Sequence, residues 1–141
     1  MTKDYIHKVH YHETDRMGIT HHSNYIKWME QARVHYLDQI GYGYARMERE
    51  GIIYPVIGIE CQYKHTITFD DEVCIRVEVE EFRGVRLVIR YRMTKVSDGT
   101  TVLTGRSTHC FTTPAGKPII LKKQFPELDK LLRSMVVLKD E

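Results

Sequence analysis

The stretch from Asn24 to Gly41, NYIKWMEQARVHYLDQIG, decides the fold class. Its apolar residues recur at helical spacing and form one stripe, made of Tyr25, Trp28, Met29, Ala32, Tyr36, Leu37 and Ile40. Ser23 and Asn24 are residue types that cap helix N-termini, and Gly41 stands where a glycine in the left-handed conformation ends a helix. The sequence therefore predicts one long helix, Asn24 to Ile40, about 17 residues in length.

The chain on either side of this helix is predicted to form strands. Apolar and polar residues alternate in 73–80 and again in 86–93, which is typical of strands with one buried face. Further predicted elements are a strand at Tyr5 to His12, a short helix at Tyr44 to Glu50 ended by Gly51, extended chain within Ile52 to Thr68, a turn at Ser97 to Gly99, a strand at Val102 to Thr113 and a helical extension at about 125–137. One long helix against an antiparallel sheet of about five strands is an α+β fold.

Size and charge exclude several classes of protein. The 141 residues predict a single domain, 1–141, that is long enough to bury a core without disulfides or metal. Basic and acidic residues are nearly balanced, 21 against 19, and the resulting formal charge of +2 does not indicate a nucleic-acid-binding protein. No apolar run approaches the ~20 residues that a membrane-spanning helix needs, and the first five residues carry no signal region. Cys61, Cys74 and Cys110 are an odd, scattered set, which favours reduced thiols and a cytoplasmic location.

One loop, Thr14 to Tyr25, contains the residues that point to chemistry. Asp15 precedes the predicted helix N-terminus, and Gly18 allows the chain to fold back on itself. The amides of His22, Ser23 and Asn24 would form a partly positive site there. A carboxylate beside such donors is the minimum arrangement for ester or thioester hydrolysis, although an aspartate in a loop is more often a solvated turn residue.

The segment YHETDRMGITHHSNY, Tyr11 to Tyr25, and the IKWMEQAR that follows it resemble the signature of hotdog-fold acyl-CoA thioesterases of the hydroxybenzoyl-CoA thioesterase-like group. FDDE at 69–72 and FRGVR at 82–86 resemble that family's acidic and basic turns. The resemblance implies a hotdog fold, in which the sheet wraps the long helix. It also implies hydrolysis of an acyl-CoA to a carboxylic acid and free CoA.

The resemblance assigns roles to individual residues. It implies that Asp15 is the catalytic carboxylate, acting as general base or nucleophile, and that the amide of His22 polarises the thioester carbonyl. We expect the substrate to be contacted by Gly18, His21, Asn24, Tyr25, Arg83 and Arg86, the two arginines binding the phosphates of CoA. No cofactor is expected, because CoA is part of the substrate. The expected assembly is a homodimer or homotetramer with sites at the dimer interface, which hides open strand edges.

Several alternatives remain open from the residues alone. A hotdog dehydratase or hydratase would pair His21 or His22 with Glu30, whereas an ion pair between Glu30 and Arg33 would make Glu30 structural. A non-catalytic acyl-CoA-binding protein is a further alternative. Glu13 either faces the cleft and raises the pKa of Asp15 or points to solvent. The histidines between His10 and His22 lack the paired spacing of a metal site, so no metal is expected.

Overall fold

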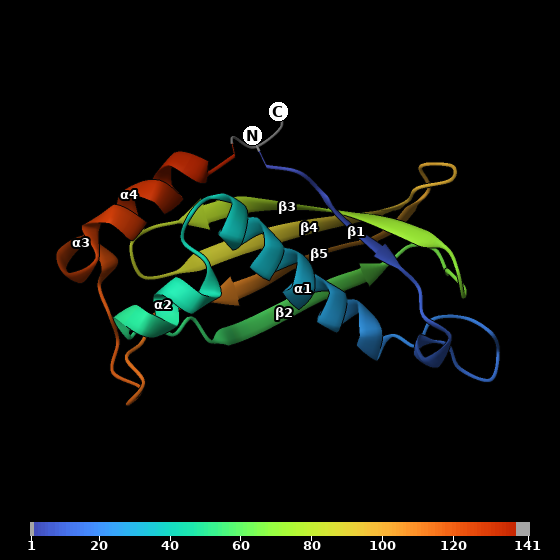
Figure 1. The fold of residues 1–141 in the computed structure, drawn as a ribbon, viewed down its shortest axis with the longest axis horizontal. Helices are drawn as coiled ribbons and strands as arrows, with labels where there is room; N and C mark the ends of the chain where they lie inside the picture. Colours follow the sequence, from blue (N-terminus) through green and yellow to red (C-terminus); the bar gives the residue numbers. More distant parts are fainter. Residues whose placement is uncertain (1, 138–141) are drawn as a thin grey trace.

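The computed structural model describes residues 2–137, so the predicted domain ends at 1 and 141 lie outside the described residues. The elements follow in the order β1 (Tyr5–Lys8), η1 (Tyr11–Glu13, a 3-10 turn), α1 (Ser23–Gln39), α2 (Tyr44–Glu50), β2 (Val56–Tyr63), β3 (Glu72–Phe82), β4 (Leu87–Lys95), β5 (Thr101–His109), α3 (Leu121–Gln124) and α4 (Pro126–Met135). Figure 1 shows α1 lying across one face of the sheet, with α3 and α4 at the sheet end near α2.

The five strands form one antiparallel sheet in the order β1-β3-β4-β5-β2. The register places Val77, Tyr91, Gly105 and Cys61 in one row across β3, β4, β5 and β2. This row faces α1, since the thiol of Cys61 contacts the sulfur of Met29 at 3.7 Å. The prediction of an α+β fold, with one long helix against about five antiparallel strands, is confirmed.

Helix α1 begins and ends one residue earlier than the sequence predicts. Its apolar stripe is buried, with Trp28 and Met29 at 0% exposure. Gly41 ends it as predicted, with a φ of +86°, and the amide of Tyr42 donates to the carbonyl of Leu37 at 3.2 Å. The predicted capping role of Ser23 and Asn24 is wrong, because the N-cap residue is His22 and both fall inside the helix.

The first predicted strand is shorter than expected, and the C-terminal helical region begins earlier, at Leu121 rather than at about 125. The predicted strand from Tyr5 to His12 ends at Lys8, because the chain then turns into η1, where the Glu13 carboxylate accepts the His10 amide at 2.7 Å. The C-terminal extension is two helices that meet at Phe125, where Pro126 occupies the first turn of α4. The predicted α2 is confirmed, and Gly51 ends it with a φ of +79°.

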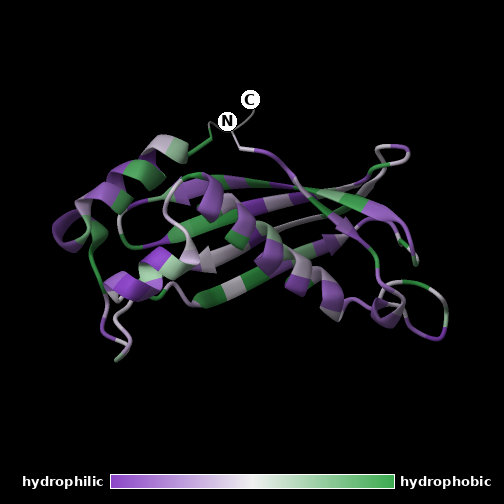
Figure 2. Ribbon diagram, viewed as in Figure 1, coloured by the Kyte–Doolittle hydropathy of each residue, from purple (hydrophilic) through white to green (hydrophobic). Residues whose placement is uncertain are grey.

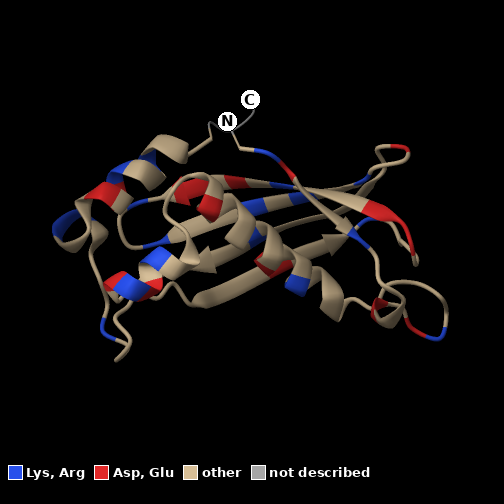
Figure 3. Cartoon of the chain, viewed as in Figure 1, with Lys and Arg blue, Asp and Glu red and all other residues tan. Residues whose placement is uncertain are grey.

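The sheet face opposite α1 is open and charged. Outward-pointing residues form cross-strand ion pairs there, including Glu78 with Arg90 at 3.0 Å and Arg106 with Glu80 at 2.9 Å. Figure 3 shows the charged positions along the strands, and Figure 2 shows the alternation of hydrophilic and hydrophobic residues. A hollow of about 930 Å³ lies over this face and is lined largely by these charged side chains. No helix among residues 2–137 is long and apolar enough to cross a membrane.

Candidate active site

Asp15 lies at the corner of a tight turn that leads from η1 to α1. Thr14 and Thr20 are paired across this turn. The amide of Gly18 donates to the Asp15 carbonyl at 2.9 Å, and the amide of Met17 donates to the Asp15 carboxylate at 2.8 Å. Gly18 has a φ of +77°, which favours glycine at that position. The sequence Asp15 to Gly18 thus closes on itself and leaves the Asp15 carboxylate half-exposed at the surface.

Hydrogen bonds to the chain before β3 hold the turn against the sheet. The hydroxyl of Thr68 donates to the Gly18 carbonyl at 2.6 Å, and the amide of Thr20 donates to the Ile67 carbonyl at 2.9 Å. Gly18 therefore shapes and anchors the turn. Its predicted contact with substrate stays a prediction.

Most amides at the start of α1 already have acceptors. The amide of His21 donates to the Glu13 carbonyl at 2.9 Å, that of Asn24 to the His21 carbonyl at 3.0 Å, and that of Ser23 to Nδ1 of His21 at 3.3 Å. Within residues 2–137, the amide of His22 has no hydrogen-bond acceptor. The expected group of three free amides is therefore reduced to one, at the position that the family resemblance indicates.

The other residues predicted at this loop divide into exposed and buried pairs. The rings of His21 and His22 are exposed and stack with centroids 4.3 Å apart. The Asn24 side chain is buried and donates to the Glu13 carbonyl at 2.9 Å. Tyr25 packs against the Trp28 ring, and burial raises the pKa of its hydroxyl to about 12. In this chain Asn24 and Tyr25 support the loop from below, while His21 and His22 stand at its surface.

Glu13 takes neither of the two orientations considered for it. It is 6% exposed and points into the protein, where Oε1 accepts the His10 amide at 2.7 Å and Oε2 accepts the indole N–H of Trp28 at 2.7 Å. Nε2 of His7 lies 3.0 Å from Oε1. Burial opposes ionisation, but the bonds from His10, His7 and Trp28 outweigh it and lower the pKa of Glu13. Glu13 is thus a buried carboxylate held by three donors.

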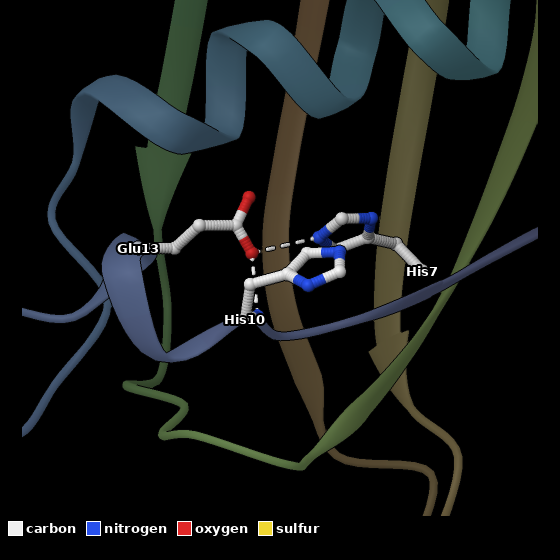
Figure 4. Close-up of side chains that lie close together, drawn as sticks. All are labelled: His7, His10 and Glu13. Carbon is white, nitrogen blue, oxygen red and sulfur yellow. Dashed lines mark hydrogen bonds and ion pairs between the residues drawn. The ribbon is translucent and has the colours of Figure 1, made fainter.

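His7, His10 and Glu13 form a cluster whose possible ligand atoms lie within 4.8 Å of one another (Figure 4). Such a set has the residue types of a zinc site. Both Glu13 oxygens, however, already accept hydrogen bonds from groups of the protein. A metal ion would have to displace His7 from the carboxylate, so the geometry favours a hydrogen-bonded cluster. The absence of a bound metal stays a prediction.

Arg83 and Arg86 lie at the other end of the sheet from Asp15. They follow β3, which starts beside β1 at Glu72 and runs for 11 residues, about 35 Å, before reaching Arg83. Arg83 pairs there with Glu81 at 2.8 Å. Within one chain this basic turn does not lie beside Asp15, because the hairpin β3–β4 extends away from the turn at Asp15 (Figures 1 and 3). The predicted contact of Arg83 and Arg86 with the substrate stays a prediction.

Three comparisons identify the family. The model of the thioesterase-like superfamily matches residues 9–130. The chain belongs to this superfamily. It is 31% identical over 120 residues to the putative acyl-CoA thioesterase YneP of Bacillus subtilis, covering 85% of this chain and 87% of that protein.

Solved structures agree with this assignment. A DHNA-CoA thioesterase from Staphylococcus aureus has 32% identity and a TM-score of 0.88, over 94% of this chain and 89% of that one. A gentisyl-coenzyme A thioesterase has 26% identity and a TM-score of 0.77, over 83% and 94% of the two chains. The hotdog fold expected of this thioesterase-like protein is thereby confirmed.

A buried polar chain in this thioesterase-like protein was not expected from the sequence. Arg33, on α1, is 6% exposed and bonds Tyr91 on β4, rather than Glu30 on its own helix. Tyr91 continues to Ser107 and His109 on β5. The inward-facing positions of Tyr91, Ser107 and His109 follow from strand alternation, but only the packed structure shows that they meet Arg33.

Proposed function

We propose that this protein hydrolyses acyl-CoA thioesters to a carboxylic acid and free CoA. The observation that carries the proposal is the half-exposed carboxylate of Asp15 on the same short loop as the unpaired amide of His22. Membership of the thioesterase-like superfamily and the two CoA thioesterases among the solved relatives support it. The protein is thus proposed to be an enzyme, with Asp15 as its catalytic residue.

The amide of His22 stabilises the charge that develops on the thioester oxygen. Addition to the carbonyl carbon turns its oxygen into an oxyanion, and an amide at a helix N-terminus offers both a donor and the positive end of the helix dipole. Asp15 either takes a proton from the attacking water or attacks the carbonyl itself, in which case water then hydrolyses the resulting acyl-aspartate anhydride and regenerates the Asp15 carboxylate. In both cases the C–S bond breaks, CoA leaves as a thiolate that gains a proton, and the acyl group ends as a carboxylate.

We propose a second copy of this chain as the partner that completes the site. β2 is at one edge of the sheet. Val56 and Ile57 on it are 44% and 59% exposed, and strand edges of this kind readily pair with another strand. Two copies joined antiparallel at β2 are related by a two-fold axis across the sheet. This dimer is the proposed unit, and a pair of such dimers would make the tetramer.

The same two-fold axis gives Arg83 and Arg86 a role. It places the β3–β4 turn of one copy at the end of the joined sheet where Asp15 of the other copy lies. We propose that these arginines bind the CoA phosphates across the dimer, where a guanidinium can form two bonds to one phosphate.

The acyl group is proposed to enter among side chains at the Asp15 end of the dimer. Trp28, Met29, Tyr36 and Tyr54 are buried and fill the core of one chain, so they are not free to line a cavity in it. Large apolar side chains are exposed at this end instead: Tyr11 at 76%, Met17 at 77%, Tyr63 at 52% and Phe69 at 51%. Exposed apolar groups gathered near a polar site suit binding of an acyl chain or a partner surface.

The dehydratase alternative has weaker support. Glu30 lies eight residues beyond His22 along α1, a rise of about 12 Å, so the two side chains do not form a pair within one chain.

The described cysteines Cys61, Cys74 and Cys110 are free. This supports the proposal of a reducing, cytoplasmic location.

Release of free CoA from acyl-CoA, followed with a thiol reagent, tests the proposed function. The panel should run from short aliphatic to aromatic acyl groups and include one carrier-protein thioester. Turnover of at least one acyl-CoA supports hydrolysis. A change in enoyl absorbance without thiol release would indicate the dehydratase, and saturable binding without turnover would indicate an acyl-CoA-binding protein.

A further inference from the structure

We propose that Glu13 is a positioning residue for this site, because its side chain and its main chain together fix the Asp15 turn to the first turn of α1. The inference rests on the proposed function in assigning a purpose to that geometry. Its structural part, the rigid junction, is testable without any substrate.

The side chain of Glu13 joins three segments of the chain. Oε2 accepts from Trp28, which is fully buried on α1. Oε1 accepts from the His10 amide at the start of η1 and lies 3.0 Å from Nε2 of His7, a buried residue on β1. Figure 4 shows the carboxylate pointing at His7 between the strand and the helix. The carboxylate therefore links β1 and η1 to the body of the long helix.

The main chain of Glu13 forms the second half of the junction. Its carbonyl accepts two hydrogen bonds, from the His21 amide at 2.9 Å and from the Asn24 side chain at 2.9 Å. His21 directly precedes His22, whose amide is the proposed oxyanion donor. Asp15 is two residues beyond Glu13 on the other side. The proposed carboxylate, Asp15, is thus two residues from Glu13 along the chain. The proposed donor, the His22 amide, directly follows the residue that is bonded to the Glu13 carbonyl.

The tip of the turn between these two groups is exposed, and the Thr68 hydroxyl holds it at the Gly18 carbonyl. Arg16, Met17 and Gly18 are exposed, and Met17 is 77% exposed. The bond from Thr68 ties the tip to the chain before β3 and not to α1, so the separation between Asp15 and the His22 amide depends on the base of the turn, where Glu13 and Thr20 lie. Displacing a reacting group by about 1 Å can reduce a rate ~100-fold, so a rigid base is needed for turnover.

The chemistry of the cluster fits positioning better than stability alone. Burying a carboxylate is costly unless donors surround it, and apolar residues of similar volume often replace a buried ion pair without loss of stability. What apolar residues cannot supply is a fixed direction: the Glu13 oxygens specify where Trp28 and the His10 amide must lie. This directional role is the part that the experiment must detect.

The test is the variant Glu13→Gln, which keeps the shape of the side chain and removes its charge. We expect kcat for acyl-CoA to fall by about 10- to 100-fold, with KM changed less than about threefold, because binding groups stay in place while the reacting groups shift. Glu48→Gln, at an exposed position of α2, is the matched control and should leave both constants unchanged.

A second readout does not depend on activity. Trp28 is the one tryptophan in the sequence, so its indole N–H gives a single NMR signal that reports its bond to Glu13. In Glu13→Gln this signal should shift, and the amides of Met17 and Gly18 should exchange with solvent about tenfold faster or more. Trp28→Phe, which keeps a ring but removes the N–H, should move kcat and amide exchange in the same direction by a smaller factor, and it serves if Glu13→Gln does not fold.

The outcomes separate this inference from the proposed function. Unchanged kcat and unchanged exchange in folded Glu13→Gln would overturn it, and so would stoichiometric zinc that purified wild-type protein holds and the variant lacks. If the wild type releases no thiol but the variant loosens the turn, the proposed function fails while the junction stands. If wild-type turnover is normal and the variant keeps both a rigid turn and its kcat, only the positioning role is lost.

Discussion

The guanidinium of Arg33 donates a hydrogen bond from Nη1 to the hydroxyl oxygen of Tyr91 at 2.9 Å, with both side chains buried between α1 and the sheet. The Tyr91 hydroxyl also lies 2.6 Å from the hydroxyl of Ser107. At the other end, Nδ1 of His109 donates at 3.2 Å to the Tyr54 carbonyl, which can only accept, and Nε2 of His109 lies 2.8 Å from the Ser107 hydroxyl. Since burial lowers the pKa of His109 to about 4, its imidazole is neutral at pH 7, so Nε2 accepts from Ser107 and Ser107 accepts from Tyr91.

Tyr91→Phe should destabilise the protein by about 1–3 kcal/mol, because Arg33 loses its buried acceptor and Ser107 loses a donor. The free energy of unfolding in urea measures this. Tyr44→Phe removes a hydroxyl from a tyrosine that is 54% exposed and should cost less than about 0.5 kcal/mol. Equal stability of the two variants would contradict the structural role assigned to the Tyr91 hydroxyl.

The stability of the protein should decline as the pH falls from 6.5 towards 4. Burial, followed by the positive charge of Arg33, lowers the pKa of His109 from 6.5 to about 4. Below pH 6.5 the histidine is protonated in the unfolded chain, whereas in the folded chain it stays neutral until about pH 4. The free energy of unfolding therefore falls by ~3 kcal/mol over this range. The lowered pKa of Glu13 acts in the same direction, but only below its ordinary value of 4.5.

Urea unfolding at pH 7, 6, 5 and 4.5 measures this dependence. His109→Asn should have a lower stability at pH 7 and a flatter curve between pH 6.5 and 5. A slope in this variant as steep as in the wild type would assign the dependence to other groups.

Asp15→Asn should lower kcat for acyl-CoA at least about 100-fold with no change in the far-ultraviolet circular dichroism. The asparagine oxygen can still accept the Met17 amide, so the turn is kept while the base or nucleophile is lost. Asp98→Asn is a matched control, since Asp98 likewise accepts an amide two residues on, from Thr100 at 2.9 Å. Near-normal hydrolysis by Asp15→Asn would refute the assignment of the carboxylate.

Replacing Arg83 and Arg86 together by alanine should raise KM for acyl-CoA more than KM for a short thioester that lacks the nucleotide. The difference in KM for acyl-CoA between the variant and the wild type should shrink as the salt concentration rises, because salt screens the contacts between arginine and phosphate. Arg49→Ala, at an exposed position of α2, controls for the change in net charge. An equal effect on both substrates would remove these arginines from the CoA site.

Ile57→Lys should dissociate the proposed dimer, because it puts a charge on the exposed edge of β2. Light scattering should then give a mass near the 16.7 kDa of one chain. Turnover per chain should fall with the loss of the partner. An unchanged mass would place the interface elsewhere.

Periodic patterns predicted the parts of the fold whose burial is one-sided. The stripe of α1, the alternation in β3 and β4 and the terminating Gly41 and Gly51 all lie where the sequence indicates. These features depend on short-range geometry, which a sequence records directly.

Contacts between distant segments could not be predicted in the same way. The sequence left Glu13 either facing the cleft or pointing to solvent, since nothing local shows that Trp28 and His7 converge on it. For Arg33 the sequence offered only a local partner, Glu30, because its actual acceptor, Tyr91, is 58 positions away. The family resemblance located Asp15 and the basic turn in the sequence, but it did not show that they lie at opposite ends of one chain.

That separation has a consequence for mixed populations of chains. One subunit carries a carboxylate at one end of its sheet and a basic turn at the other, and bending a loop cannot bring them across about 35 Å. In the proposed dimer each site combines the carboxylate of one subunit with the arginines of the other. A chain inactivated at Asp15 would therefore still supply its arginines to its partner, and a chain lacking those arginines would still supply its carboxylate. Mixing the two impaired variants would thus give one intact site in each mixed dimer.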